Sequence, residues 1–517
     1  MSSAVWSLTA EQRQEVVSRV CSNLCALAFA NKGSSWKLMD AMKVAKTIET
    51  KAYTAAEVQA VTTTGARPKT DVTKAYARKL SELIMEVVQG NIDVNANGAA
   101  STSPDNENVV DLSGSREFLT KPAAEEMLSG LLTTGAKVEK VVFSMKSFST
   151  DAAEVAAKGL ENVKATLKQA DISDTIAGRP ESEALKVLQK LSVALSKSNL
   201  MDLDLSDNAL GEKGVRACED VLKSQMGLRN LALRNVGCSD KACEAVDELL
   251  VTSDLRGLFL YNNMSGSKGA EAIARILSRA PQLERFQMAS SRVEAEGGNA
   301  LAKSLCSGSC LVELDLSDNT MTEEVAEGLA AVIKHQSSLR VLNLNDTSLG
   351  DEGVAVIATA LAQAAPQLET LELALNEVTP ESAKKIAAAL VNKKSLKKLN
   401  LRENELEDRG ALLIARGLEG NETLEELDLV MNMIGRAGSV GVAKALGNKP
   451  NFKRLDLDDN QISEAGIEEM KGVLEKNFGQ SDALGSLEEN DPDAEEDDDD
   501  EIKELTRSIA TISLDAE

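Results

Sequence analysis

The chain has 517 residues, more than one compact domain usually holds. Its formal net charge of −25 argues against nucleic acids and anionic membrane surfaces as partners, because contacts to phosphate need lysine or arginine; it favours a partner with a basic face. The seven cysteines include no Cys-x-x-Cys pair and the single histidine is His335, so we expect free thiols, no metal site and no histidine-dependent catalysis.

Residues 1–90 are predicted to form a small all-helical domain. Capping-box patterns begin at Thr9 and Thr54, and apolar residues recur at helical spacing in the segments around them. A polar segment rich in Gly, Ser and Asn follows at residues 91–108 and is predicted to be a flexible linker. Because the N-terminus carries no long apolar run, we expect no signal peptide and a cytoplasmic location.

The largest part of the chain is a tandem repeat. The template L-x-x-L-x-L-x-x-N recurs, with some degenerate copies, at residues 200, 228, 255, 283, 311, 339, 368, 396, 424 and 452, which are intervals of 27 to 29 residues. Such a unit has room for a strand and a full helix. We therefore predict an α/β fold, a leucine-rich-repeat solenoid of the ribonuclease-inhibitor-like horseshoe type, with about thirteen units over residues 109–480.

The template predicts the position of two sets of polar residues, one on the concave surface and one within the loops. The residues between the template leucines face the concave side, where Asp204, Asp207, Glu313 and Asp315 predict an acidic surface suited to a basic partner, although a merely solvated face remains an alternative. The template asparagines are predicted to form a structural ladder with the neighbouring loops, as for Asn319, Asn376, Asn404, Asn432 and Asn460.

The regular pattern is broken at two places. The unit that begins at Leu228 has Val236 at the template position, so the preceding Asn235 should keep its side chain outside the ladder, at the rim where strand passes into loop. An insertion at Asp174 to Glu181 lies in the loop after a strand, and it contains Arg179. Insertions in repeat arrays often map to the binding face.

The last segment, residues 481–517, is predicted to be an acidic disordered tail. Between Glu488 and Glu501, 11 of 14 residues are acidic, and such a run repels itself. The tail serves either solubility or the tethering of a basic partner.

Several of these segments resemble the plant-type Ran GTPase-activating proteins. The similar segments are DLSGSREFLTK from Asp111, IAGRPESEAL from Ile176, LDLSDNALGEKGVRA from Leu203 and NDPDAEEDDDD from Asn490. The resemblance implies a protein that binds a Ran-type GTPase in its GTP form and accelerates hydrolysis by ordering the GTPase's own catalytic residues. It implies no cofactor and no catalysis by the chain itself, and the sequence contains no GxxxxGK[ST] nucleotide loop.

The resemblance also assigns site residues. Its loop arginine falls on Arg179 and its rim asparagine on Asn235, in Leu233-Arg234-Asn235-Val236-Gly237, whereas Glu181 stands where some members carry a lysine. Residues predicted to bind the partner are Asp204, Asp207, Asn208, Arg234, Asn262, Asn263, Glu313 and Asp315.

The N-terminal domain resembles the plant Trp-Pro-Pro domain, which implies coiled-coil anchors at the outer face of the nuclear envelope. Here Trp6-Ser7-Leu8 stands at the motif without either proline. The alternative to GTPase activation is a non-catalytic leucine-rich-repeat scaffold or inhibitor that binds a basic protein.

Overall fold

The computed structural model describes residues 108–447, 449–478, 483–491, 494 and 499–514, together with scattered positions between Arg13 and Ile84. The chain divides into two compact units, Met1–Glu107 with Leu112–Arg116, and Asn108–Asp111 with Glu117–Glu517. No helix in the described part of the chain is both long and apolar enough to cross a membrane.

The described positions between Arg13 and Ile84 are helical, and they hold a charged cluster around the buried Glu49. The guanidinium of Arg13 donates to both carboxylate oxygens of Glu49, at 2.7 and 2.6 Å, and lies 3.8 Å from the centre of the Tyr53 ring. The Tyr76 hydroxyl donates to the same carboxylate at 3.0 Å. Glu49 is therefore buried with its charge matched, as a buried carboxylate must be. Of the linker predicted at residues 91–108, all but residue 108 lies outside the described residues, and so does Trp6-Ser7-Leu8.

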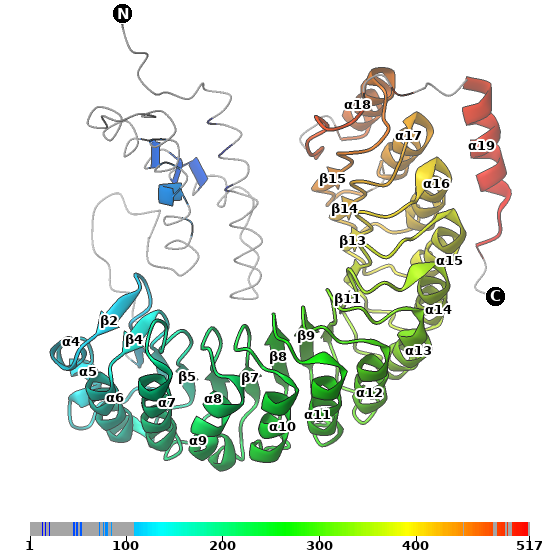
Figure 1. Ribbon diagram of the computed structural model, residues 1–517. Helices are drawn as coiled ribbons and strands as arrows, with labels where there is room; N and C mark the ends of the chain where they lie inside the picture. Colours follow the sequence, from blue (N-terminus) through cyan, green and yellow to red (C-terminus); the bar gives the residue numbers. More distant parts are fainter. Residues whose placement is uncertain are drawn as a thin grey trace, which may run out of the picture. The chain divides into compact units, whose positions relative to one another are not determined.

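The second unit is a repeat solenoid, which confirms the predicted fold class. Thirteen strands of its described residues form one parallel sheet whose order follows the chain. They line the concave side of the unit and the helices lie on its convex side (Figure 1). The strands are β1 (Val109–Asp111), β3 (Lys140–Val142), β5 (Gln169–Asp171), β6 (Asp202–Asp204), β7 (Asn230–Ala232), β8 (Gly257–Tyr261), β9 (Arg285–Ala289), β10 (Glu313–Asp315), β11 (Val341–Asn343), β12 (Thr370–Glu372), β13 (Lys398–Asn400), β14 (Glu426–Asp428) and β15 (Arg454–Asp456).

The helices follow from apolar residues at helical spacing. In α14, Val354, Ile357, Ala358 and Leu361 share the buried face. The helices of this unit are α4 (Lys121–Met127), α5 (Ser129–Leu132), α6 (Thr150–Val163), α7 (Glu181–Leu195), α8 (Gly211–Ala217), α9 (Glu219–Ser224), α10 (Asp240–Leu249), α11 (Gly266–Ser278), α12 (Ala295–Leu305), the 3₁₀ turn η1 (Glu323–Val325), α13 (Ala326–His335), α14 (Gly350–Gln363), α15 (Pro380–Leu390), α16 (Glu407–Leu418), α17 (Arg436–Ala445), α18 (Glu464–Phe478) and α19 (Asp499–Thr511).

A ladder of buried asparagines links successive repeats, as predicted. The Asn376 side chain donates to the carbonyl oxygens of Leu344 and Ala374, at 2.7 and 2.9 Å, and accepts from the backbone nitrogens of Thr347 and Leu349. Asn319, Asn404, Asn432 and Asn460 are buried in the same way. These bonds satisfy loop N–H and C=O groups that have no partner within their own repeat.

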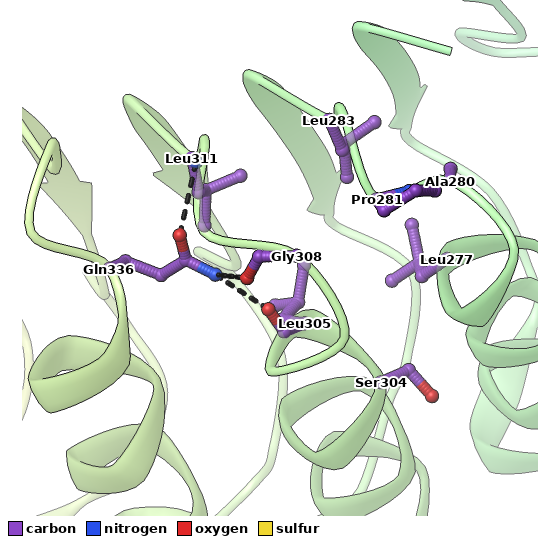
Figure 2. A pocket seen from close by; sticks show the side chains of 9 residues that line it. All are labelled: Leu277, Ala280, Pro281, Leu283, Ser304, Leu305, Gly308, Leu311 and Gln336. Atoms are coloured by element: carbon purple, nitrogen blue, oxygen red, sulfur yellow. Dashed lines mark hydrogen bonds between the residues drawn. The ribbon is translucent and has the colours of Figure 1, made fainter. Parts of the chain in front are cut away.

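A second row of polar side chains closes the turns between helix and strand. Gln336 donates to the carbonyl oxygens of Leu305 and Gly308, at 2.6 and 2.7 Å, and accepts from the nitrogen of Leu311 (Figure 2). In later repeats the buried lysines Lys393 and Lys449 take this position, and each donates to two backbone carbonyls. Burial lowers the pKa of both ammonium groups to about 8.

The cavity beside Gln336 has a volume of only about 10 Å³. It is lined by the nine residues drawn in Figure 2, which include Leu277, Pro281 and Leu283. A space of this size barely holds one water molecule. It is therefore a packing gap between two repeats, and a substrate does not fit there.

The prediction of a disordered tail from residue 481 is wrong for the described residues of that segment. Leu484 pairs with Leu455 in parallel fashion, and the Asn490 side chain accepts from the nitrogen of Asn460 at 3.1 Å, which extends the ladder. Helix α19 follows and packs on the convex side against α15 and α16. Its apolar residues lie at helical spacing behind the acidic run, whose composition dominated the prediction.

Candidate functional site

From the third repeat onward, the residue directly before each ladder position has a left-handed backbone, and some of these loops hold a second such residue further along, such as Arg292 or Glu377. We call this set the rim row; from the third repeat onward its members are Asp174, Asp207, Asn235, Asn262, Ser290, Asp318, Asp346, Leu375, Glu403, Met431 and Asp459, with φ between 49° and 57°. Asp and Asn, which fill most of these positions, tolerate this conformation because their short polar side chains can form hydrogen bonds nearby. The row marks the edge of the sheet from which loops lead to the helices.

Asn235 lies in this row with its side chain exposed, as predicted. Its Nδ2 donates to Oδ1 of Asp207 at 3.0 Å, and its Oδ1 accepts from Nδ2 of Asn262 at 3.1 Å. Three successive repeats thus join their rim side chains in one hydrogen-bonded chain. Val236, at the template position, is fully buried.

Hydrogen bonds from the next repeat hold the loop that carries Asn235. Oδ1 of Asn263 accepts from the nitrogens of Val236 and Cys238, at 3.2 and 3.0 Å. The Ser265 hydroxyl donates to the carbonyl oxygen of Cys238 at 2.8 Å. The backbone beneath Asn235 therefore has little freedom to move.

Two predicted partner-binding residues belong to the ladder instead. Asn208 is fully buried and Asn263 is 3% exposed, and both amides are bonded to loop backbone. Their assignment to the binding surface is not supported, because both side chains are buried and both amides are committed to the ladder. Both stand at the template position, so the sequence pattern already contained the correct interpretation.

Arg179 is mostly enclosed at the N-terminal end of the unit. Strands β2 (Glu117–Leu119) and β4 (Lys146–Phe148) form a separate parallel pair there. The guanidinium donates to the carbonyl oxygen and the hydroxyl of Ser147, at 2.7 and 3.0 Å, and lies 5.2 Å from the ring centre of Phe118. The Arg179 side chain is 16% exposed, so it offers one edge rather than a free cation.

Gly178 makes this arrangement possible. Its φ is 70°, and a Cβ there would lie 3.0 Å from the Phe118 ring. Only glycine combines that backbone conformation with so close an approach. We call Phe118, Gly178 and Arg179 the N-terminal corner.

The concave surface of strands β7 to β10 holds an aromatic and cationic cluster that the sequence analysis missed, apart from Arg234 and Asp315. Arg234 and Arg285 lie on the Phe259 ring, with 4.7 and 5.4 Å to its centre. Arg234 donates to Gln287 at 3.1 Å, and Gln287 donates to Asp315 at 2.9 Å. Burial lowers the pKa of Arg234, and three carboxylates near it oppose that shift. No motif signals the cluster, because its members come from four repeats.

Of the acidic residues predicted for the concave side, Asp204 lies on β6 and Glu313 and Asp315 lie on β10, whereas Asp207 belongs to the rim row. Glu313 is exposed, and Asp204 and Asp315 are half-buried.

Asp171, in register with Asp204 on the neighbouring strand, has its pKa raised to about 6 by burial and by the Asp204 carboxylate. Two carboxylates side by side form a surface that a cation would stabilise. In the described residues we find no cluster of His, Cys, Asp and Glu arranged to hold a metal ion.

Two family models match separate parts of the chain. The family model "WPP domain" matches residues 2–98, and the model "Leucine Rich repeat" matches residues 196–217, 335–358, 365–387, 392–415 and 448–470. Among solved structures, the chain is similar to that of the Rad7 and Elc1 complex in yeast, with 16% identity, 67% of this chain and 86% of that chain covered, and a TM-score of 0.42. By the two family models alone, the chain combines a WPP-domain segment with leucine-rich-repeat segments.

The proteins with similar sequences point to a more specific class of leucine-rich-repeat protein. It is 38% identical over 238 residues to RAN GTPase-activating protein 1 of Arabidopsis thaliana and 40% identical over 236 residues to RAN GTPase-activating protein 2 of the same plant. These matches cover 45% and 44% of this chain and 43% of each relative, so the chain matches less than half the length of either. A match to Ran GTPase-activating protein 1 of Xenopus laevis has 41% identity over 91 residues, 17% of this chain and 16% of that protein. The resemblance to the plant-type Ran GTPase-activating proteins is confirmed.

Proposed function

We propose that this protein is a GTPase activator for a Ran-type small GTPase and accelerates the hydrolysis of GTP bound to that partner. The observation that carries the proposal is Asn235, an exposed amide held on a rigid rim, in a chain similar to two plant Ran GTPase-activating proteins. Transfer of a phosphoryl group to water depends on the positioning of the water and on stabilisation of charge. A fixed amide that orders the GTPase's own catalytic residues serves the first need.

The N-terminal corner supplies the second part of the proposed site. Arg179 lies in the loop between β5 and α7, and Asn235 lies in the loop after β7, on the same strand-to-loop edge. We propose that the exposed ring of Phe118 and the edge of the Arg179 guanidinium anchor the GTPase beside its switch regions. The activator needs no nucleotide site of its own, because the nucleotide stays on the partner.

The acidic concave surface fits a GTPase partner with a basic face. Asp204, Glu313 and Asp315 face this side, and unlike charges speed the encounter of two proteins. We further propose a cytoplasmic protein that acts in nucleocytoplasmic transport, and that its WPP domain binds coiled-coil anchors at the outer face of the nuclear envelope.

The decisive experiment is single-turnover hydrolysis of Ran-bound GTP with substoichiometric amounts of this protein. A large acceleration in which each activator molecule serves many GTPase molecules supports the proposal. The Asn235→Ala variant should lose most of the acceleration, and Asp346→Asn, which alters a distant member of the rim row, should keep it. Binding without acceleration in the unaltered protein would reject the proposal and favour the scaffold or inhibitor.

A further inference from the structure

The chain of side chains through Asn235 has a direction. Asp207 ends it with a carboxylate, which can only accept hydrogen bonds. The Asn235 amide must therefore turn its Nδ2 toward Asp207, at 3.0 Å, and its Oδ1 toward Asn262. Asn262 must in turn present its Nδ2 to that oxygen, at 3.1 Å. One carboxylate thus sets the orientation of two amides, which would otherwise be free to flip.

The backbones beneath these side chains have matching geometry. The φ values of Asp207, Asn235 and Asn262 are 57°, 53° and 51°, so the three side chains leave their repeats in the same direction. Each backbone nitrogen is bonded to the following repeat: that of Asp207 to the carbonyl oxygen of Arg234 at 2.8 Å, and that of Asn235 to the carbonyl oxygen of Tyr261 at 2.6 Å. The orientation of the amide therefore rests on a rigid base.

This pattern is local. From Ser290 to Asp459, no side-chain hydrogen bond joins neighbouring members of the rim row among the described residues. An amide nitrogen has two hydrogens and its oxygen two lone pairs. Asn235 therefore keeps one N–H and one acceptor position for a partner, both in a fixed orientation.

We propose that Asp207 and Asn262 are positioning residues that fix the direction of the Asn235 amide, so that the amide reaches the catalytic side chains of the bound GTPase in one orientation only. This inference rests on the proposed function. It assigns to Asp207 a role other than charge complementarity: its carboxylate acts through Asn235.

The first test replaces the carboxylate by its isostere. Asp207→Asn can either donate or accept, so the direction of the chain is lost. We expect the single-turnover rate at saturating activator to fall about tenfold, the usual scale for the loss of a hydrogen bond to a charged group, while affinity for the GTP-bound GTPase changes less than about twofold. Asp346→Asn removes the same charge from the same row and should change neither quantity. A rate for Asp207→Asn equal to that of Asp346→Asn would overturn the proposal.

The second test reverses the chain while it conserves charge and the number of hydrogen bonds. In the double variant Asp207→Asn with Asn262→Asp, the carboxylate lies on the other side of Asn235, so the Asn235 amide should turn around. We expect the rate to stay about tenfold low, because the orientation is wrong. Recovery of the full rate in the double variant would show that charge alone matters and would overturn the inference.

A measurement on the protein alone, without the GTPase, tests this inference separately from the proposed function. The side-chain amide resonances of Asn235, assigned by their loss in Asn235→Ala, should shift in Asp207→Asn and stay in place in Asp346→Asn. If the unaltered protein fails to accelerate hydrolysis, the proposed function fails; if these resonances are the same in Asp207→Asn as in the unaltered protein, the positioning fails whatever the activity.

Discussion

The guanidinium of Arg416 on α16 donates to the carbonyl oxygen of Ile509 at 2.7 Å, near the C-terminal end of α19. It also donates to the carbonyl oxygen of Ile512. A cation at a helix C-terminus satisfies carbonyl groups that the helix leaves open and interacts favourably with its dipole. The segment behind the acidic run is therefore attached to the repeat array by both apolar and polar contacts.

Loss of the Ile509 side chain should release α19. Ile509 is 4% exposed and packs with Leu412 and Leu413, so Ile509→Ala should weaken docking by about 2–4 kcal/mol. Hydrogen exchange should then rise across residues 499–511 and stay unchanged in β12 to β15. Glu504→Ala, at an exposed position of the same helix, is the matched control. Equal protection of α19 in both variants would contradict the docked position.

Replacement of Arg179 should loosen the N-terminal corner. Arg179→Lys keeps the charge and loses the fork that reaches both the hydroxyl and the carbonyl oxygen of Ser147, a loss of about 1–3 kcal/mol in local stability. Hydrogen exchange should rise at β2 and β4 while the later repeats keep their protection. Arg409→Ala, which removes an exposed ion pair, should change neither region. A corner that stays protected without Arg179 would mean that the guanidinium is free for the partner.

Lys393 should make the protein more stable as the solution becomes moderately alkaline. Its pKa is about 8 in the folded chain and about 10.5 when unfolded, so the unfolded chain binds more protons between these values and stability rises with pH. Lys393→Gln introduces the side chain that Gln336 provides at the equivalent turn of an earlier repeat. The variant should be more stable than the parent at pH 7, by on the order of 1 kcal/mol, with a smaller advantage at pH 9.5. Urea midpoints at the two pH values test this, and a constant difference would refute it.

Asp171 should have the opposite pH dependence. Burial and the Asp204 carboxylate raise its pKa to about 6 in the folded chain. Its favourable contribution is present below the unfolded value of about 3.8 and is lost as the pH rises through 6. Asp171→Asn should stabilise the protein at pH 7, by on the order of 1 kcal/mol, and change little at pH 4. Asp204→Asn should reduce the effect, since it removes one of its two causes; an equal gain at both pH values would exclude the mechanism.

The repeat pattern predicted the fold because one register specifies every strand. The template places Leu314 and Leu342 on the buried side of neighbouring strands, and the structure pairs them directly. The same rule accounts for Asn235. Its side chain stays outside the ladder because Val236, the next residue, occupies the template position. It also explains the errors at Asn208 and Asn263, where partner binding was predicted for residues that obey the ladder rule.

Other features depend on contacts that no local pattern contains. The enclosure of Arg179 requires β2 and β4, which come from separate segments and pair only in the folded chain. The stacking of Arg234 and Arg285 on Phe259 joins three repeats across the sheet. Helix α19 could have been predicted, because Leu505, Ile509 and Ile512 have helical spacing. The acidic composition of the preceding residues led to the prediction of disorder instead.

The rim row has a consequence for how such a protein changes during evolution. The backbone at each row position is set by the loop and the ladder, so its side chain can be exchanged without a shift of register. Asp and Asn enter at low conformational cost, whereas Leu375 and Met431, both 42% exposed, adopt a left-handed backbone that costs roughly 1 kcal/mol or more. Each repeat therefore contributes one exchangeable side chain to the rim. Single substitutions there can adapt the surface to a new partner, while the spacing between neighbouring side chains stays constant.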